Sequence, residues 1–508
     1  MIDNLNIATL LPLIVFVPLL VALLVFLVNQ EKWQKIINIG FALLQFTIVI
    51  TITLLFLKAN ILQSQRYQIG NWGAPLGIDL VVDGFSIVMV SLTGLLTLIL
   101  TLYSTAYFSE SSKGVRFWPL WWLLISGLNA LFVSNDAFNI YVALEIIGLA
   151  AAALVALQST REALEAALRY LLVGLLGSLF YLMAIAILYR SHGTLDLIQI
   201  AESTDHQLPD QIAIIFITAG LLLKIALFPL HFWLPPAHAN APTPVSAILS
   251  ALVVKASLYV LIKFWFEVLN ESTTVDASQF IGYLGATAIL YGSWKAFQAT
   301  HLKVVIAYST VAQLGYIFLL FPLSEQAANT GTFTGSASQA AIYFIVAHAC
   351  AKAAMFLSAG NLILSQGSGE ISQLKGIARR QPVNLFVFAI AGVSLIGLPP
   401  SAGFIAKWLL LTASIESGQW WWSIVILLGG LMAAMYIAKI LHLAFTNVEN
   451  NIAPHYPEDN YILDTQPQAI HWILTATAIV LALTTLALGI NAEFILNMAN
   501  PTLTGSTL

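Results

Sequence analysis

Long apolar runs separated by short polar segments fill almost the whole chain. Each run comes close to or exceeds the roughly 20 residues that a helix needs to cross the hydrocarbon core of a bilayer. The runs fall near residues 9–28, 36–57, 80–107, 117–133, 136–157, 164–190, 211–232, 243–269, 279–298, 303–322, 338–364, 383–409, 420–446 and 469–497. Because lipid cannot satisfy open backbone groups, each run is predicted to be a helix. The pattern predicts an all-α polytopic membrane protein with 14 transmembrane helices.

The composition agrees with a chain that lies in lipid. Of its 508 residues, 59% are hydrophobic and 9% are charged, whereas a soluble domain carries about 25% charged residues. The net charge of −4 gives no reason to expect nucleic-acid binding. The single cysteine, Cys350, excludes an internal disulfide and a multi-cysteine metal site. Since no phosphate-binding or dinucleotide-binding glycine motif occurs in a strand–helix setting, no cofactor and no metal are predicted.

The distribution of basic residues predicts the orientation. Connections after odd-numbered runs hold Lys32, Lys35, Lys113, Arg116, Arg161, Lys295, Lys303, Lys375, Arg379 and Arg380. Connections after even-numbered runs hold Lys58, Arg66, Arg190 and Lys263. Cytoplasmic loops are enriched in Lys and Arg, so the odd connections are predicted to be cytoplasmic and both termini to lie outside. The longer connections 58–79 and 190–210 are interpreted as solvated loops.

A segment broken by prolines separates the seventh and eighth runs. Lys224 lies in the run before it and Lys255 in the run after it, with Pro229, Pro235, Pro236, Pro242 and Pro244 between them. Run 383–409 contains a second break, GLPPSAGF, which is followed by Lys407. Interrupted helices at matching positions are the sequence signal of an inverted-repeat transporter. We therefore predict broken helices 7 and 12 within two equivalent five-helix units.

This pairing divides the chain into four parts. Residues 1–116 would hold helices 1–3 and residues 117–269 the first five-helix repeat, helices 4–8. Residues 279–446 would hold the second repeat, helices 9–13, and residues 469–497 the last helix.

Charged side chains inside these runs are candidates for function, since each costs at least about 2.5–3.5 kcal/mol at the bilayer centre. Glu145 lies mid-run in FNIYVALEIIGLAAAALVAL. A buried carboxylate tends to be protonated unless a cation lies nearby, and Lys224 is the candidate cation. Such a coupled pair can act as a protonic switch. The alternative is a structural ion pair that holds two helices together.

Four further residues extend the candidate site. Lys255 lies about two turns into its run, and a buried lysine can accept and release protons near neutral pH; the alternative is that it reaches an interface. His348 and Lys352 are four residues apart and share a helix face. Histidine titrates near physiological pH, although a single histidine on an apolar helix is often only a satisfied polar group. Lys407 is predicted to release the proton, and His231 is a candidate extension of the path.

Other polar and aromatic residues are interpreted as anchors. Lys439 and His442 lie near the end of a run and are expected to reach the interface. Two tryptophan groups, Trp121 with Trp122 and Trp420–Trp422, resemble interfacial belts.

Four stretches resemble a known family. They read LLLKIALFPLHFWLPPAHANAPTPVSAILSALVVKASLYVL, KVVIAYSTVAQLGYIFL, HACAKAAMFLSAG and SLIGLPPSAGFIAKW. Together they are similar to the signature regions of the antiporter-like membrane subunits shared by respiratory complex I and Mrp-type cation/proton antiporters. The resemblance implies fourteen helices with two inverted five-helix repeats, in agreement with the pattern of runs.

The resemblance also implies roles for residues of this chain. Those that match the family's proton-transferring positions are Glu145 of the fifth helix, Lys224 of the broken seventh, Lys255 of the eighth, His348 and Lys352 of the eleventh and Lys407 of the twelfth. In many relatives the eleventh helix reads H-x3-H-x3-K, but here Phe344 occupies the first histidine position. A water molecule or another side chain would have to bridge that position.

One further stretch, GNWGAPLGIDLVVDGFSIVMV, is most similar to the D-type subunits of Mrp-type antiporters. The resemblance then implies a proton-translocating subunit of a multisubunit Na+(cation)/H+ antiporter in a bacterial plasma membrane. Its partners would be other membrane subunits, protons, and Na+ or another monovalent cation. The alternative is a proton-pumping, non-redox subunit of a complex I-type NADH:quinone oxidoreductase or a membrane hydrogenase. Whether the chain belongs to an enzyme depends on this choice, and a passive scaffold is disfavoured by six ionisable groups in the membrane.

Overall fold

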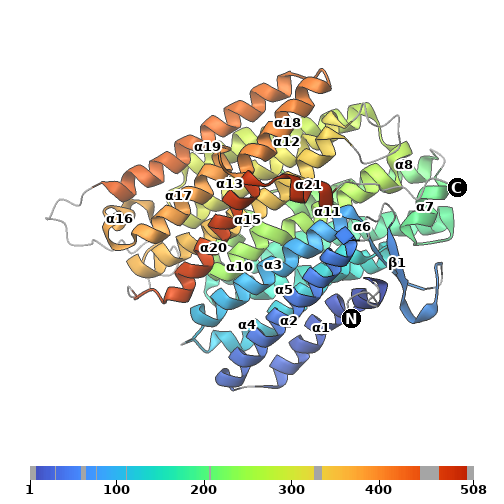
Figure 1. The fold of residues 1–508 in the computed structure, drawn as a ribbon. Coiled ribbons are helices and arrows are strands. Elements are labelled where there is room, and N and C mark those ends of the chain that lie inside the picture. Colours follow the sequence, from blue (N-terminus) through green and yellow to red (C-terminus); the bar gives the residue numbers. More distant parts are fainter. Residues whose placement is uncertain are drawn as a thin grey trace.

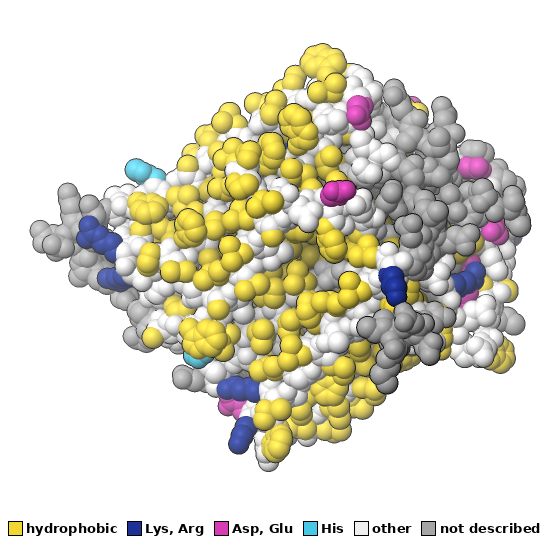
Figure 2. All heavy atoms as spheres, viewed as in Figure 1, with side chains coloured by type: hydrophobic (Ala, Val, Ile, Leu, Met, Phe, Trp, Pro, Cys, Tyr) yellow, Lys and Arg dark blue, Asp and Glu magenta, His cyan; other side chains and the backbone are white. Residues whose placement is uncertain are grey.

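The chain forms a bundle of long helices that lie side by side (Figure 1). The computed structural model describes residues 7–28, 30–58, 64–75, 77–109, 111–204, 207–324, 335–446 and 468–499. Within these residues, twelve helices are long and apolar enough to cross a membrane. Hydrophobic side chains spread over most of the described part of the face in Figure 2, as a surface in contact with lipid requires. The chain is therefore an integral membrane protein.

The N-terminal part contains helices and one small sheet. In order, its elements are α1 (Ile7–Leu27), α2 (Glu31–Lys58), β1 (Gln65–Gln68), η2 (Ile69–Asn71), β2 (Asp79–Val82) and α3 (Gly84–Tyr107). The next part contains α4 (Lys113–Val133), α5 (Ala137–Ala156), α6 (Arg161–His192), α7 (Leu197–Ser203), α8 (Leu208–Ile225), α9 (Leu234–Asn240), α10 (Thr243–Ile248), η3 (Leu249–Val253), α11 (Val254–Lys263), η4 (Phe264–Val268) and η5 (Asn270–Ser272). The elements η3 and η4 are π-helical turns within one continuous segment.

The C-terminal part is helical. Its elements are α12 (Val275–Gln298), α13 (Leu302–Phe318), α14 (Leu320–Leu323), α15 (Ser336–Gln366), η7 (Ile371–Leu374), α16 (Ile377–Arg380), α17 (Pro382–Ile396), α18 (Ala402–Glu416), α19 (Trp421–Phe445), α20 (Trp472–Ile490) and α21 (Glu493–Met498). Figure 1 places α1 and α2 at one edge of the bundle and α19 at the other.

Twelve of the fourteen predicted runs coincide with the twelve candidate spans. Run 279–298 forms α12, which is long enough to span but less apolar than the others. Run 383–409 forms two shorter helices, α17 and α18, on either side of the predicted break. The number of fourteen crossings and the inverted repeats stay predictions.

The core of the bundle consists of two long elements. The apolar stretches of α15 and of the continuous segment from α10 to η4 are wholly buried, unlike those of the other candidate spans. α15 packs against α13, α17, α18 and α20. These two elements carry Lys255, His348 and Lys352, so three of the predicted site residues lie in the interior.

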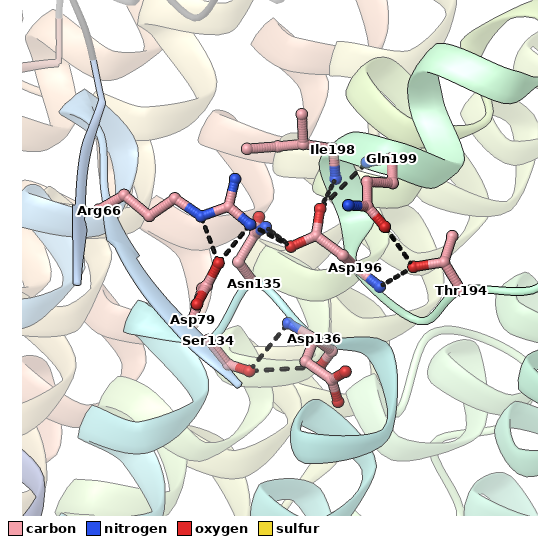
Figure 3. A network of polar contacts seen from close by, with 9 residues as sticks. All are labelled: Arg66, Asp79, Ser134, Asn135, Asp136, Thr194, Asp196, Ile198 and Gln199. Atoms are coloured by element: carbon pink, nitrogen blue, oxygen red, sulfur yellow. Dashed lines mark hydrogen bonds and ion pairs between the residues drawn. The ribbon is translucent and has the colours of Figure 1, made fainter. Parts of the chain in front are cut away.

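The interpretation of connections 58–79 and 190–210 as solvated loops is wrong only in part for the residues that the structure describes; 59–63, 76, 205 and 206 lie outside them. Most described residues of 64–78 are exposed or half-buried, but the two connections also form β1, η2 and α7 and contain buried carboxylates. β1 pairs antiparallel with β2, with Gln65 opposite Val82. Arg66 contacts the carboxylates of Asp79 and Asp196 (Figure 3), and its Nη2 lies 2.8 Å from Oδ2 of Asp196. Both carboxylates are buried, because the hairpin folds over the connection and supplies a cation. Residues 80–82, predicted to begin a helix, belong to β2 instead.

This network joins the hairpin to the ends of neighbouring helices. Asn135 donates from Nδ2 to Oδ2 of Asp196 at 2.8 Å (Figure 3). Isolated bridges connect Leu80 with Ser134 and Asp136 with Asp196. We call the end of the bundle that carries β1, β2 and α7 the hairpin end.

The interpretation of Trp121 and Trp122 as interfacial anchors is also wrong. Both side chains are fully buried, because α4 packs against α1, α3 and α5. Their indole Nε1 atoms donate to Oγ1 of Thr101 at 3.1 Å and to Oδ1 of Asn38 at 2.6 Å. Trp420 and Trp421 are exposed, in line with an interfacial position, whereas Trp422 is buried.

Candidate functional site

Glu145 of α5 and Lys224 of α8 form an ion pair, with Nζ of Lys224 3.4 Å from Oε1 of Glu145. The hydroxyl of Ser178 on α6 contacts the same carboxylate oxygen. The Lys224 side chain is 8% exposed and that of Glu145 is 20% exposed. The predicted pair is therefore present, and both side chains are mostly buried inside the helix bundle. A pair in such a position is strongly coupled, since the charge of one partner governs the proton affinity of the other.

Two glycines allow α6 and α8 to approach closely beside this pair. A Cβ atom on Gly220 would lie 2.4 Å from the carbonyl oxygen of Gly177. A Cβ atom on Gly177 would lie 2.6 Å from the carbonyl oxygen of Gly220 and 3.1 Å from Cγ of Lys224. Small residues at such an interface bring the helix backbones together. Ser178 and Lys224 thereby reach the same carboxylate.

We expect Gly220→Ala to separate Lys224 from Glu145, because the added methyl group must push α8 away from α6. Overpacking of this kind costs about 1–3 kcal/mol, so the thermal unfolding temperature should also fall. The matched control is Gly174→Ala on α6, where a Cβ atom would meet nothing within 4 Å. An unfolding temperature of Gly220→Ala equal to that of Gly174→Ala would show that the glycine contact does not position the pair.

Both helix breaks place a lysine at the C-terminal end of a helix. Lys224 lies in the last turn of α8, which ends where Ala226 adopts a left-handed conformation with φ 60°. Lys407 of α18 donates from Nζ to the carbonyl oxygens of Leu395 and Ile396, at 2.9 Å each, in the last turn of α17. The free carbonyl groups at a helix C-terminus favour a cation. The second break thus makes a place where a buried ammonium group, that of Lys407, is stabilised without a carboxylate, whereas Lys224 at the first break pairs with Glu145.

Lys255 lies in the first turn of α11 and is fully buried. Its ammonium group donates to the carbonyl oxygen of Ser250, which lies in the π-helical turn η3. The hydroxyl of Ser250 is 2.9 Å from that of Thr310 on α13. Turns of the π type are rare and occur often at functional sites. The burial excludes the alternative that Lys255 reaches an interface.

Lys352 of α15 is also fully buried and faces the same part of α13. Its Nζ lies 2.9 Å from the carbonyl oxygen of Ile306 and contacts the hydroxyl of Ser309. Because Ser309 and Thr310 are adjacent, two neighbouring hydroxyls of α13 separate Lys352 from the Ser250–Lys255 pair. His348, one turn before Lys352, lies within electrostatic reach of both lysines. Its ring is 2% exposed and neither ring nitrogen has a hydrogen-bond partner within the described chain.

The polar face of α13 continues toward Lys407. Gln313, four residues after Ser309, donates from Nε2 to the carbonyl oxygen of Leu395 at 3.1 Å. That oxygen also accepts from Nζ of Lys407. Tyr316 places its hydroxyl 3.3 Å from the same ammonium group, and its ring centroid lies 4.4 Å away. α13 therefore links the surroundings of Lys352 to Lys407 without passing through Phe344, whose ring stacks on Tyr316 at 5.5 Å.

Two residues of this polar cluster, His238 and Lys303, were not predicted to be site residues from the sequence. His238 lies in α9, between α8 and α10, and is fully buried. Neither of its ring nitrogens has a hydrogen-bond partner in the described part of the chain. It lies within electrostatic reach of Lys255, Lys303 and Lys352. The assignment of Lys303 to a cytoplasmic connection is wrong, since it is 6% exposed and donates to the carbonyl oxygen of Ala241 at 2.7 Å. It begins α13, so its position beside a loop in the sequence concealed its burial.

The predicted extension through His231 has different neighbours. The His231 ring lies 5.2 Å from that of Tyr291, 5.6 Å from that of Phe228 and 6.2 Å from that of Tyr308. Its Nδ1 atom has no partner among the described residues. Lys439 donates to the carbonyl oxygens of Phe297 at 2.8 Å and Ala299 at 3.3 Å, which fits its interpretation as an anchor.

The chain is similar in sequence to subunits of two kinds of membrane complex. The family model described as "NADH:quinone oxidoreductase/Mrp antiporter, TM" matches residues 134–433, which include the six predicted site residues. The N-type subunit of the NADH-quinone oxidoreductase of Desulforudis audaxviator is 35% identical over 389 residues, 75% of either chain. The D-type subunit of the Na(+)/H(+) antiporter of Alkalihalophilus pseudofirmus is 27% identical over 438 residues, 85% of this chain and 86% of that one.

Solved structures share the fold. A chain of the Mrp complex from Dietzia sp. superposes with a TM-score of 0.86 at 24% identity, covering 98% of this chain and 97% of that chain. A chain of the membrane-bound sulfane sulfur reductase, an archaeal respiratory membrane complex, superposes with a TM-score of 0.82 at 23% identity, covering 96% of both chains. The fold thus occurs in two kinds of membrane complex.

Proposed function

The chain belongs to the transmembrane family shared by NADH:quinone oxidoreductases and Mrp antiporters, and from this premise we propose that it is the proton-translocating subunit of a multisubunit cation/proton antiporter. The observation that carries the proposal is a series of buried ionisable groups. It begins at the Glu145–Lys224 pair, continues through Lys255 and Lys352, and ends at Lys407.

Protons would enter at Glu145 and Lys224, pass Lys255, His348 and Lys352, and leave past Lys407. Loss of a proton from Lys224 weakens its attraction for Glu145 and raises the affinity of that carboxylate for a proton. Each buried lysine is favoured in its neutral form by the apolar surroundings and in its charged form by the carbonyl and hydroxyl oxygens around it. A change in the charge of a neighbouring residue then decides whether each lysine is protonated, so a proton can move from one lysine to the next in steps.

We propose that α13 joins the two halves of this path. Ser309 and Thr310 lie between Lys255 and Lys352, and Gln313 and Tyr316 lie toward Lys407. Hydroxyl groups can donate and accept at once, whereas an amide holds water and carbonyl groups in place. This bridge supplies the connection that Phe344 interrupts on α15.

We expect Gln313→Leu to slow proton transport by about tenfold, since the change is similar in size and removes the donor to the carbonyl oxygen of Leu395. The measurement is cation-driven proton flux in vesicles that contain the assembled complex. Thr287→Val on α12 is the control, because that hydroxyl is exposed and bonds only within its own turn, to the carbonyl oxygen of Tyr283 at 2.7 Å. Equal flux in Gln313→Leu and wild type would remove Gln313 from the path.

The proposal includes the number of membrane crossings, the repeats, the orientation and the partners of the chain. The chain would cross the membrane fourteen times, with inverted repeats at 117–269 and 279–446, an N-terminal part at 1–116 and a last helix at 469–497. Both termini and the hairpin end would lie outside a bacterial plasma membrane. The buried Lys303 and Lys263 no longer count as loop charges, but the excess on odd connections persists without them. The partners would be other membrane subunits, protons, and Na+ or another monovalent cation.

A second candidate function is a proton-pumping subunit of a redox-driven complex, which is favoured by the 35% identity to an oxidoreductase subunit of the N type. Mass spectrometry of the complex purified in mild detergent separates the two. The antiporter proposal predicts small hydrophobic partners without flavin or iron–sulfur subunits. Stoichiometric co-purification of iron–sulfur proteins would instead support the redox-driven pump, with the same residues transferring protons.

A further inference from the structure

A second buried cluster of lysine and carboxylates lies at the hairpin end, away from the six predicted residues. Lys263, the last residue of α11, places Nζ 2.7 Å from Oδ2 of Asp83. The same Nζ lies 3.9 Å from Oε2 of Glu267 in η4. The side chains of Asp83, Lys263 and Glu267 are 5%, 8% and 20% exposed. The assignment of Lys263 to a connection between runs is wrong, because it ends α11 and its side chain is buried against these carboxylates.

Asp83 and Lys263 have an evident structural role. Asp83 caps α3, accepting from the backbone N–H of Ser86 at 2.7 Å, while the Ser86 hydroxyl accepts from the backbone N–H of Asp83 at 2.7 Å. The other carboxylate oxygen of Asp83 binds Lys263 and so ties α3 to α11. This contact between α3 and α11 requires one carboxylate and one lysine, which Asp83 and Lys263 supply.

Glu267 is not needed for that contact. Its Oε1 atom is buried and has no hydrogen-bond partner within the described chain, and Oε2 approaches Lys263 only to 3.9 Å. With all three groups charged, the cluster carries a net negative charge; with one proton added, it is neutral. Burial favours the neutral cluster, because an unpaired charge out of water is costly. The cluster therefore has a place for one exchangeable proton.

The cluster lies on the same helical segment as Lys255. Lys255, Tyr259, Lys263 and Glu267 follow at intervals of four residues, so each lies about one turn beyond the last. Nζ of Lys263 lies 5.4 Å from the centroid of the Tyr259 ring. The π-helical turn η3 immediately precedes the helix of Lys255, and η4 contains Glu267. Both charged positions thus adjoin a type of turn that is rare and frequent at functional sites.

Glu267 is also the member of the cluster with access to the outside of the bundle. It is the most exposed of the three side chains. η4 lies against α7 at the hairpin end, where Thr204 donates to the carbonyl oxygen of Val268 at 3.3 Å. A proton on Glu267 can therefore exchange with water at that end.

We propose that Asp83, Lys263 and Glu267 form a proton-exchange site that connects Lys255 with the aqueous phase at the hairpin end. The Glu267 carboxyl group releases its proton to water, and the carboxylate that remains is stabilised by the Lys263 ammonium group. The carboxylate is reprotonated by a proton that leaves the Lys255 ammonium group and travels along the helix face that carries both residues. Lys255 is left as a neutral amine. This inference rests on the role proposed above for Lys255.

The test compares Glu267→Gln and Lys263→Arg in the assembled complex in vesicles. Glu267→Gln resembles the protonated acid in shape and charge, and Lys263→Arg keeps the positive charge that stabilises the Glu267 carboxylate. Both variants should assemble with unchanged thermal stability. Glu267→Gln should transport protons at least about tenfold more slowly per assembled complex, whereas Lys263→Arg should keep most of the wild-type flux. Asp276→Asn is the matched control, because that carboxyl begins α12 near the same end and is exposed.

Two results would overturn the inference. One is wild-type flux per assembled complex in Glu267→Gln while Glu145→Ala remains inactive, which leaves the proposed function standing. The other is a loss of flux that follows only a loss of assembled complex, which would assign a purely structural role. If Glu145→Ala and Lys224→Ala also transport normally, the proposed function itself fails.

Discussion

Replacing Lys224 with alanine is expected to reduce cation-dependent proton exchange to the background of empty vesicles. The substitution removes the cation 3.4 Å from Glu145, and with it the coupling that lets one group's charge set the proton affinity of the other. Glu145→Ala should have the same effect, because Lys224 then lacks the carboxylate to which it responds. Flux is measured with a pH-sensitive dye in vesicles that contain the complex.

Assembly should survive the Lys224→Ala change. Removing one partner of a buried pair costs about 3–5 kcal/mol when the remaining charge cannot be neutralised. Glu145 escapes much of that penalty, because it can take up a proton and keeps its contact with the Ser178 hydroxyl. Lys439→Met is the control, since it removes a lysine from α19 outside the proposed path. Lys224→Ala complexes that exchange ions at the wild-type rate would contradict the switch.

Replacing Lys352 with methionine is expected to lower proton flux by about a hundredfold or more, the scale of losing a group that transfers a proton directly. The methionine side chain is of similar length, so α15 should keep its packing. What disappears is the ammonium group between the carbonyl oxygen of Ile306 and the Ser309 hydroxyl. No other described side chain contacts those α13 oxygens from α15, so the path would be interrupted at its centre.

Lys352→Arg distinguishes charge from proton transfer at the same position. Arginine stays protonated in proteins, so it keeps the positive charge while it cannot release a proton. We expect this variant to be as inactive as Lys352→Met. Cys350→Ala, a buried change two residues away on α15, should leave transport unchanged. An active Lys352→Arg complex would show that the lysine acts only through its charge.

The sequence was informative where a residue type is costly in lipid or breaks a helix. Glu145, Lys224 and Lys407 were identified because ionised groups inside apolar runs are expensive. The breaks at 226–233 and 397–401 were identified because Pro and Gly interrupt backbone hydrogen bonding. These two signals predicted the ion pair and the broken helices, and the structure contains both.

The sequence was less informative about which face of a helix is buried. In a membrane both faces of a helix are apolar, so hydrophobic periodicity does not separate lipid contacts from helix contacts. The Ser309–Gln313–Tyr316 face of α13 therefore gave no strong signal, although its spacing of four and three residues was visible. It became apparent as a path only when the η3–α11 segment, α15 and α17 were seen to meet α13.

Charges near the ends of runs were misassigned for a related reason. Lys263 and Lys303 lie within a few residues of predicted connections, where basic residues normally meet water. In the structure they are held by Asp83 and by the carbonyl oxygen of Ala241. Both partners are distant in the sequence, so local pattern carried no information about them. The same applies to Arg66, whose partner Asp196 lies 130 residues away.

Protons are proposed to cross the membrane through this chain along its buried ionisable groups. The most direct measurement is proton flux in vesicles containing the complex, with all six groups of the proposed path replaced together by neutral residues. Those are Glu145, Lys224, Lys255, His348, Lys352 and Lys407. We expect cation-dependent flux in the wild-type complex and none above background in the assembled six-residue variant. Wild-type flux through that variant would contradict it and make the chain a scaffold for transport elsewhere.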